Sequence, residues 1–182
     1  VTGLNPDSQQ GDKVILDILK RCGGKFKPVE GGLHFDRSLL KATEIDLADC
    51  PDLGPILFTL GCFCSGETVI RNAGRLRLKE SDRIESMQTE LRKMGARIEV
   101  DGDTVHIQGV ALHAPNAPLS GHNDHRIVMA LAVAAIASGL PALLCGAEAV
   151  DKSWPAFWSV LRGLGAKVEL NTDKQEEFDI KA

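Results

Sequence analysis

The residues Lys79 to Arg83 form the densest group of side chains in this sequence that could do chemistry. They read Lys-Glu-Ser-Asp-Arg, follow Arg75 and Arg77, and precede an amphipathic run that begins at Ile84. Cations beside a carboxylate, where a loop becomes a helix, can hold an anion and move a proton, because a helix N-terminus adds unpaired backbone N–H groups. The alternative is a solvated first helical turn whose acids favour the helix dipole.

Polar side chains also gather at other points where the pattern predicts a strand to end or a helix to begin. Asp49 and Asp52 precede one apolar helix, the run from His122 to Arg126 precedes another, and Lys152 follows a strand. The candidates combine cations with carboxylates: Lys79, Arg83, Arg126, Lys152 and Arg75 with Asp52, Glu80 and Asp49. Arginine offers a planar fork to phosphate or carboxylate, and carboxylates beside cations suit proton transfer. Since there is neither a glycine-rich phosphate loop nor a nucleophile elbow, this set indicates an electrostatic clamp for a small phosphorylated carboxylic acid.

The histidines and cysteines give little indication of a metal site. His122 and His125 could be ligands together with Asp124, but two imidazoles and one carboxylate are few for zinc. The five cysteines are odd in number and lack paired zinc spacing, and Cys62 and Cys64 lie in an apolar helical run. We therefore expect no metal, cysteines that belong to the core, and a reducing cytoplasm.

Composition narrows the class of protein. The chain has 182 residues, 43% hydrophobic and 25% charged, which is ordinary for a globular domain with a full core. A net charge of -4 makes a general nucleic-acid surface improbable. No apolar run approaches the ~20 residues of a membrane-spanning helix, so we expect no membrane partner either.

A helix followed by a strand recurs three times. Gly23, Gly95 and Gly165 each end a predicted helix and are spaced by 72 and 70 residues, and an alternating strand follows each of them. After the second copy, the strands Arg97–Val100 and Thr104–Ile107 flank Asp-Gly-Asp and predict a hairpin.

A second element recurs at another phase of the same period. The apolar helices Ile56–Ser65 and Arg126–Ser138 each end at Ser-Gly and are followed by the strands Thr68–Ile70 and Ala142–Leu144. One supersecondary unit is therefore repeated every 70-odd residues. We expect helices such as Ile127–Ile136 to be central, because they are apolar almost all round, and the polar-faced Ile84–Met94 to be outside.

The first copy of this unit is incomplete. Val1–Gly3 corresponds to the end of the strand that Thr68–Ile70 supplies in the second copy, and the apolar helix before it is missing. We expect a fragment cut within its first unit, the alternative being a chain that naturally starts on a degenerate unit. Because equivalent strands end near a common axis, three polar loops should line one end of the domain. They contain Asn5, Asp7, Ser8 and Gln9; Arg75, Arg77, Lys79, Glu80 and Arg83; and Glu148, Asp151, Lys152 and Ser153.

The motifs Lys79–Arg83, Asn123–Arg126, Pro51-Asp52 and Asp151–Ser153 together resemble the 5-enolpyruvylshikimate-3-phosphate synthases, also called 3-phosphoshikimate 1-carboxyvinyltransferases. The resemblance covers nearly the whole chain in order and spacing. It implies an α/β (α+β) fold of repeated βαβαββ units around buried helices, one domain of an inside-out α/β barrel. Residues 1–182 would then be a single domain, most of the C-terminal one, and the N-terminal partner domain would be absent from this chain.

The resemblance also implies an activity. The family transfers the enolpyruvyl group of phosphoenolpyruvate to the 5-hydroxyl of shikimate 3-phosphate, releases phosphate, and needs no metal or organic cofactor. Asp52, Glu80 and Lys152 would be catalytic, with Asp52 taking the hydroxyl proton and Lys152 protonating the methylene carbon. The substrate-binding residues would be Asp52, Lys79, Arg83, His125, Arg126 and Lys152. Some members have Asn where this chain has Arg75, so no role is carried over to that residue.

Two other functions stay open at this point. A UDP-N-acetylglucosamine enolpyruvyl transferase would share the fold and the chemistry, although the Lys-Glu-Ser-Asp-Arg stretch does not suggest its nucleotide-sugar site. A non-catalytic ligand-binding module of the same fold is opposed by the presence of Asp52, Glu80 and Lys152. Since the chain supplies one wall of a cleft, we expect it to be inactive by itself.

Overall fold

The computed structural model describes residues 1–5, 7–170 and 177–181, and it contains two complete copies of one unit. Each complete unit follows the order strand, helix, strand, helix, hairpin. The first consists of β3 (Glu44–Asp46), α2 (Gly54–Phe63), β4 (Glu67–Arg71), α3 (Arg83–Lys93), β5 (Arg97–Asp101) and β6 (Thr104–Gln108). The second consists of β7 (Leu119–Ser120), α4 (His125–Ser138), β8 (Ala142–Cys145), α5 (Phe157–Gly163), β9 (Lys167–Leu170) and β10 (Glu177–Lys181).

The two units have the same sheet topology. The strand orders are β3-β4-β6-β5 and β7-β8-β10-β9. In both, the first pair of strands is parallel and is joined by the central helix, and the other pairs are antiparallel. The predicted βαβαββ repeat is therefore confirmed.

The N-terminal part of the chain supplies the second half of a third unit. It contains α1 (Ile15–Arg21) and the hairpin β1 (Lys25–Val29) and β2 (Gly32–Asp36). Thr2 forms an antiparallel bridge with Gly32, and the Leu33 N–H donates to the Val1 carbonyl at 2.8 Å. Val1–Gly3 thus lies against β2 as β4 lies against β6, which is the correspondence that the sequence predicts.

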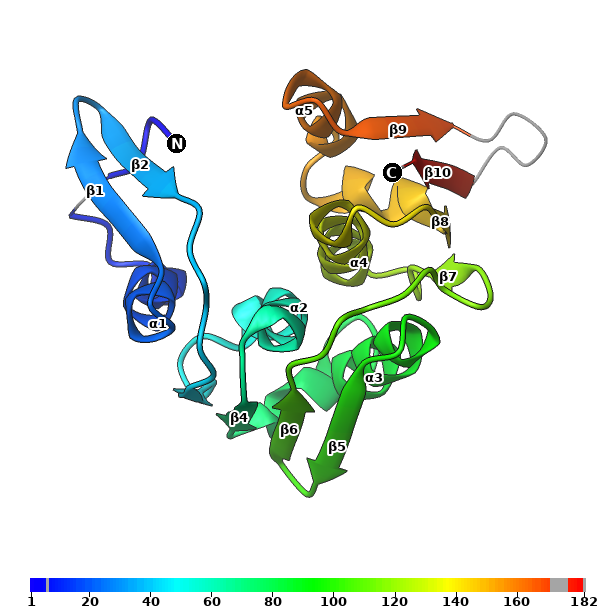
Figure 1. Cartoon of the computed structure of the whole chain (residues 1–182), viewed down its shortest axis with the longest axis horizontal. Coiled ribbons are helices and arrows are strands. Elements are labelled where there is room, and N and C mark those ends of the chain that lie inside the picture. Colours follow the sequence, from blue (N-terminus) through cyan, green and yellow to red (C-terminus); the bar gives the residue numbers. More distant parts are fainter. Residues whose placement is uncertain (6, 171–176, 182) are drawn as a thin grey trace.

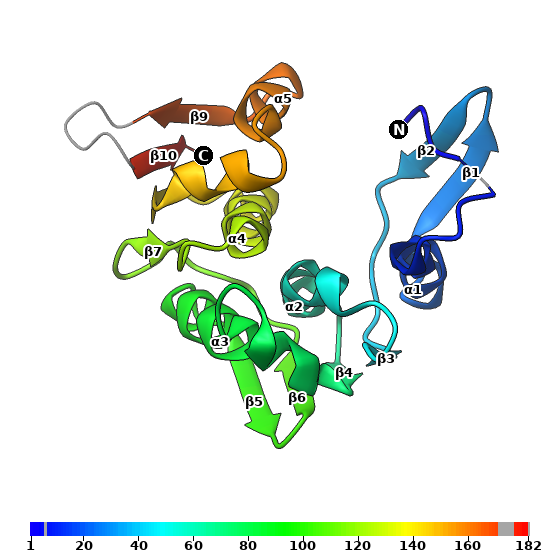
Figure 2. The same ribbon diagram turned by 180° about the vertical axis from the view of Figure 1, so that it is seen from behind.

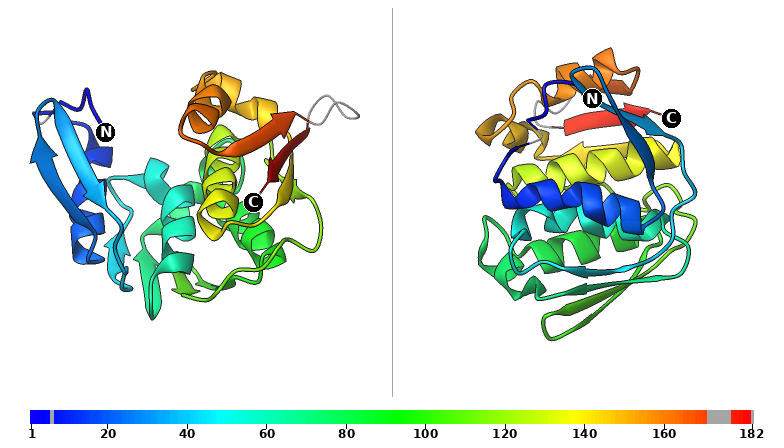
Figure 3. Two further views of the ribbon diagram at one scale, coloured as in Figure 1. Left: turned by 45° about the horizontal axis from the view of Figure 1, so that its top comes forward. Right: turned by 90° about the vertical axis from the view of Figure 1, so that its left-hand side faces the viewer.

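The units surround a helical centre. Figure 1 looks almost along the axes of α1 to α4 and shows the three hairpins on three sides of these helices, and Figure 2 shows the same arrangement from behind. The right-hand view of Figure 3 shows the four helices side-on, with their axes nearly parallel. Because the helices run together, their N-termini can lie at one end of the molecule.

Helices α2 and α4 form the core of the assembly, as their composition predicts. Leu57 and Phe58 of α2 and Ile127 and Leu131 of α4 are fully buried. The Thr59 hydroxyl donates to the carbonyl of Ala130 at 3.0 Å, so a hydrogen bond joins the two helices inside the core. Helix α3 packs against both with one face and exposes the other, which agrees with its expected outer position.

The three repeated glycines end their helices in the same way. Gly23, Gly95 and Gly165 have φ values of 83°, 86° and 96°. The N–H of the next residue bonds to a carbonyl five residues back in every copy: Gly24 to Leu19, Ala96 to Leu91 and Ala166 to Leu161, at 2.8, 3.1 and 3.0 Å. This is the Schellman arrangement, which needs a left-handed residue and therefore favours glycine.

The structure also corrects some details of the prediction. The short parallel strands β3 and β7 were not expected, and two or three residues carry too little periodicity to reveal a strand. The β5–β6 hairpin pairs Asp101 with Thr104, so its turn has the two residues Gly102-Asp103 and not three. Among the described residues, no helix combines the length and apolar character needed to cross a membrane.

Candidate functional site

Asp52 is the meeting point of three cations from different parts of the chain. It lies in the 3₁₀ turn η2 (Pro51–Leu53), directly before α2. Lys79 Nζ and Arg83 Nη1 lie 3.0 and 3.1 Å from its Oδ1, and Arg126 Nη2 lies 3.2 Å from its Oδ2. Arg126 Nη1 also donates to the Asp52 backbone carbonyl at 2.9 Å. One partly exposed carboxylate therefore orders three positive side chains.

The surrounding charges keep Asp52 ionised. Partial burial alone would raise the pKa of Asp52, but the hydrogen bond from Lys79 and the positive charges of Arg126 and Arg83 outweigh it, so the pKa lies below its ordinary value. Because 38% of the side chain is exposed, solvent and ligands can still reach the carboxylate.

Arg83 is fixed from behind by a second carboxylate. Its Nε donates to Asp124 Oδ2 at 2.8 Å, and its Nη2 donates to Asp124 Oδ1 at 3.3 Å. The exposed fractions of the two side chains are 3% and 0%, so water does not compete for this pair. Arg83 is thus anchored on one side and presents Nη1 to Asp52 on the other.

Asp124 also caps helix α4. Its Oδ1 accepts from the Arg126 N–H at 2.9 Å, and its Oδ2 accepts from the Ser81 hydroxyl at 3.2 Å. Burial alone would raise the pKa of Asp124, but the hydrogen bonds from Arg83, the Arg126 N–H and Ser81 outweigh that effect and lower it. Asp124 is therefore an ionised, fully bonded carboxylate that joins two helix starts.

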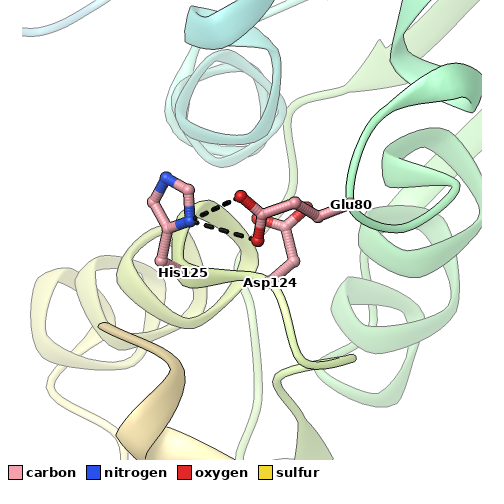
Figure 4. Close-up of side chains that lie close together, drawn as sticks. All are labelled: Glu80, Asp124 and His125. Carbon is pink, nitrogen blue, oxygen red and sulfur yellow. Dashed lines mark hydrogen bonds and ion pairs between the residues drawn. The ribbon is translucent and has the colours of Figure 1, made fainter. Parts of the chain in front are cut away.

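Glu80, His125 and Lys152 form a neighbouring group. His125 Nδ1 lies 3.1 Å from Glu80 Oε1 and 3.3 Å from Oε2, and Figure 4 shows the two side chains facing each other. Lys152 ends the 3₁₀ turn η4 (Ala147–Lys152) and lies 3.8 Å from Glu80 Oε2. Its Nζ donates to both the backbone carbonyl and the Oδ1 of Asn123, the latter at 2.7 Å.

The eight residues just described are called the charged cluster below. They are Asp52, Lys79, Glu80, Arg83, Asp124, His125, Arg126 and Lys152. The structure brings together every site residue that the sequence singled out as catalytic or substrate-binding. Asp124 was missed in this role, although its place in the Asn-Asp-His-Arg motif at a helix start could have marked it as a cap.

Some expected members lie elsewhere. Arg75 Nη1 donates to the Ala48 carbonyl at 3.1 Å, and within the described part of the chain Asp49 has no hydrogen bond or ion pair with the cluster. The loops after β4 and β8 both reach the cluster. The hydrogen bonds described for Asn5 and for residues 7–9 do not join the loop after Val1–Gly3 to the cluster, because they run only to near neighbours in the chain, up to Lys13.

The cluster favours an anion. It holds four permanent cations against three carboxylates, a balance of +1 with neutral histidine. Helices α3 and α4 begin at Arg83 and His125, and α2 begins just after Asp52, so three positive helix ends add to this charge. The arrangement can bind a small polyanion and exchange protons through Asp52 and Glu80.

A metal ion does not suit this donor set. The ligand atoms of Glu80, Asp124 and His125 lie within 4.8 Å of one another (Figure 4). However, the oxygens of Asp124 are already bonded to Arg83, Ser81 and a backbone N–H. The cations beside them would also repel a further positive ion. His122, the other imidazole considered as a ligand, meets Glu90 instead.

A hollow of about 420 Å³ lies away from the cluster, among residues 115–118, 141–143 and Ile180. Residues 115–118 precede β7, and residues 141–143 lie at the start of β8, whereas His125, Arg126 and Lys152 follow the other ends of these parallel strands. The hollow is therefore separate from the charged site.

Comparisons with known proteins agree with the fold and the motifs. A family model described as EPSP synthase (3-phosphoshikimate 1-carboxyvinyltransferase) matches residues 1–161. The 3-phosphoshikimate 1-carboxyvinyltransferase of Clostridium acetobutylicum is 44% identical over 165 residues, covering 91% of this chain and 38% of that protein. The enzyme of the same name from Brachyspira hyodysenteriae is 43% identical over 173 residues, covering 91% of this chain and 40% of that protein.

A solved structure shows the same fold. The EPSP synthase of Acinetobacter baumannii superposes with a TM-score of 0.74 at 27% identity, covering 88% of this chain and 40% of that one. This chain spans about two fifths of the length of the relatives that it matches. Its repeated units, its charged cluster and the match over residues 1–161 lead to one conclusion: the chain belongs to the EPSP synthase (3-phosphoshikimate 1-carboxyvinyltransferase) family.

Proposed function

We propose that the charged cluster is one wall of an active site that transfers the enolpyruvyl group of phosphoenolpyruvate to the 5-hydroxyl of shikimate 3-phosphate, with release of phosphate. The observation that carries this proposal is the sharing of Asp52 by Lys79, Arg83 and Arg126. A proton acceptor surrounded by cations is what an alcohol needs when it attacks a phosphorylated enol acid.

The cations divide into two groups. Arg83, Arg126 and Lys152 bind the phosphate and carboxylate of phosphoenolpyruvate. The guanidinium of Arg126, the Nη1 group of Arg83 that Asp124 leaves available and the ammonium of Lys152 match a compact polyanion. Lys79 contacts shikimate 3-phosphate beside its 5-hydroxyl, next to Asp52. His125 lines the same space through its contact with Glu80.

The reaction balances with groups that the cluster contains. Lys152 delivers a proton to the methylene carbon, C2 becomes electrophilic, and the 5-hydroxyl oxygen adds to C2 while Asp52 takes the hydroxyl proton. The tetrahedral adduct then loses phosphate from C2, and the leaving phosphate takes up the proton that Asp52 holds. A proton of the methyl group returns to the neutral amine of Lys152, which restores the enol ether. Glu80, 3.8 Å from Lys152 Nζ, is placed to exchange protons with it.

Substrate binding then activates the base. Asp52 contacts three cations, and one of them, Arg83, is paired with Asp124 as well. When a phosphate and a carboxylate occupy Arg83 and Arg126, the positive field at Asp52 falls and its affinity for a proton increases. The same carboxylate thus holds the cations in place before binding and accepts a proton after it.

The rest of the enzyme supplies the opposite wall. We propose that residues 1–182 are most of a C-terminal domain and that a separate N-terminal domain covers the cluster. Leu78 and Trp154, 86% and 45% exposed, lie next to the cluster in the sequence, and exposed apolar side chains at the rim of a polar site suit a surface that another domain covers. The five free thiols agree with a proposed location in the reducing cytoplasm.

The test is turnover by the full-length protein that contains this chain. Incubation with phosphoenolpyruvate and shikimate 3-phosphate should release phosphate in equal amount to the enolpyruvyl product, and the 182-residue chain alone should show neither. A parallel assay with UDP-N-acetylglucosamine as the acceptor distinguishes this reaction from that of a UDP-N-acetylglucosamine enolpyruvyl transferase. Turnover with that acceptor, or none with shikimate 3-phosphate, would contradict the proposal.

A further inference from the structure

Glu90 is a buried acid that lies outside the charged cluster. It projects from the third turn of α3, and 2% of its side chain is exposed. Oε2 accepts from Lys93 Nζ at 2.7 Å and from the Ser120 N–H at 2.8 Å, and Oε1 lies 3.0 Å from His122 Nε2. A buried carboxylate needs such partners, because its desolvation is costly without them.

The partners of Glu90 belong to an unusual turn. His122 and Asn123 have φ values of 49° and 54°, and such left-handed conformations are unfavourable for non-glycine residues. The turn is also confined, because the Gly121 N–H donates to the Cys145 carbonyl at 2.8 Å and a Cβ atom on Gly121 would lie 2.4 Å from Val128. Two strained residues in sequence persist only when their surroundings hold them.

The residues after His122 determine the geometry of the charged cluster. Asn123 binds the ammonium of Lys152 with two oxygens, and Asp124 fixes Arg83. His125 and Arg126 follow directly and contact Glu80 and Asp52. The bond between His122 and Glu90 precedes these residues in the chain and joins the turn to α3.

We propose that Glu90, acting through His122, is a positioning residue that holds the turn 121–124 so that Asn123 places Lys152 for phosphoenolpyruvate. The proposal rests on the proposed function. It differs from a general packing role because the bond from Glu90 to the Ser120 N–H, which ties α3 to β7, does not involve the side chain of His122.

Two substitutions of His122 separate the hydrogen bond from the backbone conformation. In His122→Gln, the side-chain amide nitrogen replaces the imidazole Nε2 and can still reach Glu90. In His122→Asn, the side chain is too short, although asparagine tolerates the left-handed conformation better than glutamine does. If only the conformation matters, Asn is the better replacement; if the bond to Glu90 matters, Gln is.

The measurement is the KM for phosphoenolpyruvate of the full-length enzyme, well below its melting temperature. We expect His122→Gln to stay within about 3-fold of the wild type and His122→Asn to raise KM about 10-fold, because small displacements of positioning groups weaken binding strongly. Glu90→Gln should raise it similarly, and Glu85→Gln, on the exposed side of the same helix, should not.

The outcomes separate the two proposals. Equal KM values for the two His122 variants, or a higher value for His122→Gln, would overturn the role of Glu90 while leaving the reaction itself intact. If His122→Asn does not fold, the comparison of Glu90→Gln with Glu85→Gln decides, again by the KM for phosphoenolpyruvate. An unchanged KM in Glu90→Gln together with a lower melting temperature would show that Glu90 has a purely structural role. A wild-type enzyme that fails to turn over refutes the proposed function instead.

Discussion

Arg83 Nε lies 2.8 Å from Asp124 Oδ2, and the two side chains are 3% and 0% exposed. The same guanidinium also extends Nη1 to the partly exposed Asp52 at 3.1 Å. One carboxylate therefore holds the arginine permanently, while the other can release it to a ligand. The cluster keeps its shape when its outer ion pairs are exchanged.

Asp124→Asn should destabilise the protein strongly. Removing one partner leaves a buried guanidinium without its counter-charge, which costs about 3–5 kcal/mol. Urea unfolding of the full-length protein measures the loss, and Asp101→Asn, at an exposed hairpin position, serves as the matched control with little change. A loss below about 1 kcal/mol would show that the Arg83–Asp124 pair is not important for stability.

The difference between wild type and Asp124→Asn should also depend on pH. The pKa of Asp124 is lowered in the folded protein, so its contribution is fully present above the unfolded value of about 4 and is lost as pH falls toward the folded value. The two free energies of unfolding should therefore approach each other below about pH 4. A difference that stays constant as the pH falls well below about 4 would contradict the lowered pKa.

Arg126→Lys should weaken binding of phosphoenolpyruvate. The guanidinium donates from Nη1 to the Asp52 carbonyl and contacts the carboxylate through Nη2, a fork that a lysine ammonium cannot reproduce. Losing a charged hydrogen bond of about 1.5–3 kcal/mol raises KM about 10- to 100-fold. Steady-state kinetics of the full-length enzyme measure this effect, with the exposed Arg97→Lys as the control, and an unchanged KM would remove Arg126 from the clamp.

The repeat made most of the fold predictable. Gly23, Gly95 and Gly165 are positions where the backbone must be left-handed, and such positions leave a clear trace in a sequence. The short strands β3 and β7 have no recognisable sequence pattern, since their pairing depends on neighbouring strands and not on their own residues. The sequence therefore predicted the helices and hairpins of each unit, whereas the short parallel strands form only through tertiary contacts.

Most members of the charged cluster were predictable, but their pairings were not. The loop ends after β4 and β8 carried the right residue types, but nothing local indicates that Asp124 binds Arg83 or that Glu90 receives His122. His122 and Asn123 both have left-handed backbones, and His122 and His125 meet different carboxylates, Glu90 and Glu80. The spacing of three residues between His122 and His125 made a shared metal site conceivable, but the two imidazoles belong to different groups of side chains.

Two of the three helix-ending glycines, Gly95 and Gly165, allow the cost of backbone strain to be separated from the cost of steric crowding. A Cβ atom at Gly165 meets nothing within 4 Å, so Gly165→Ala should cost about 1–2 kcal/mol for the left-handed backbone alone. At Gly95 the new atom would lie 2.6 Å from the ring of His113, which bonds to the Ala114 carbonyl, so Gly95→Ala should cost about 1 kcal/mol more. Unfolding of Gly95→Ala in a His113→Ala background should bring the two costs together; a persisting difference would point to another clash.

Lys79→Met tests whether Asp52 is the base. Lys79 makes the strongest of the contacts that lower the pKa of Asp52 against the opposing effect of burial, so its removal should raise that pKa. A base must be ionised, so kcat/KM falls as pH drops through its pKa, and the acid limb of the profile should move to higher pH in Lys79→Met.

The readout is the pH at which the acid limb lies. The substrates ionise identically with both enzymes, and a loss of substrate affinity lowers kcat/KM at every pH without shifting the limb. Lys20→Met, at an exposed position of α1, should leave the limb in place. An acid limb that stays at the wild-type pH in Lys79→Met would mean that another group accepts the hydroxyl proton.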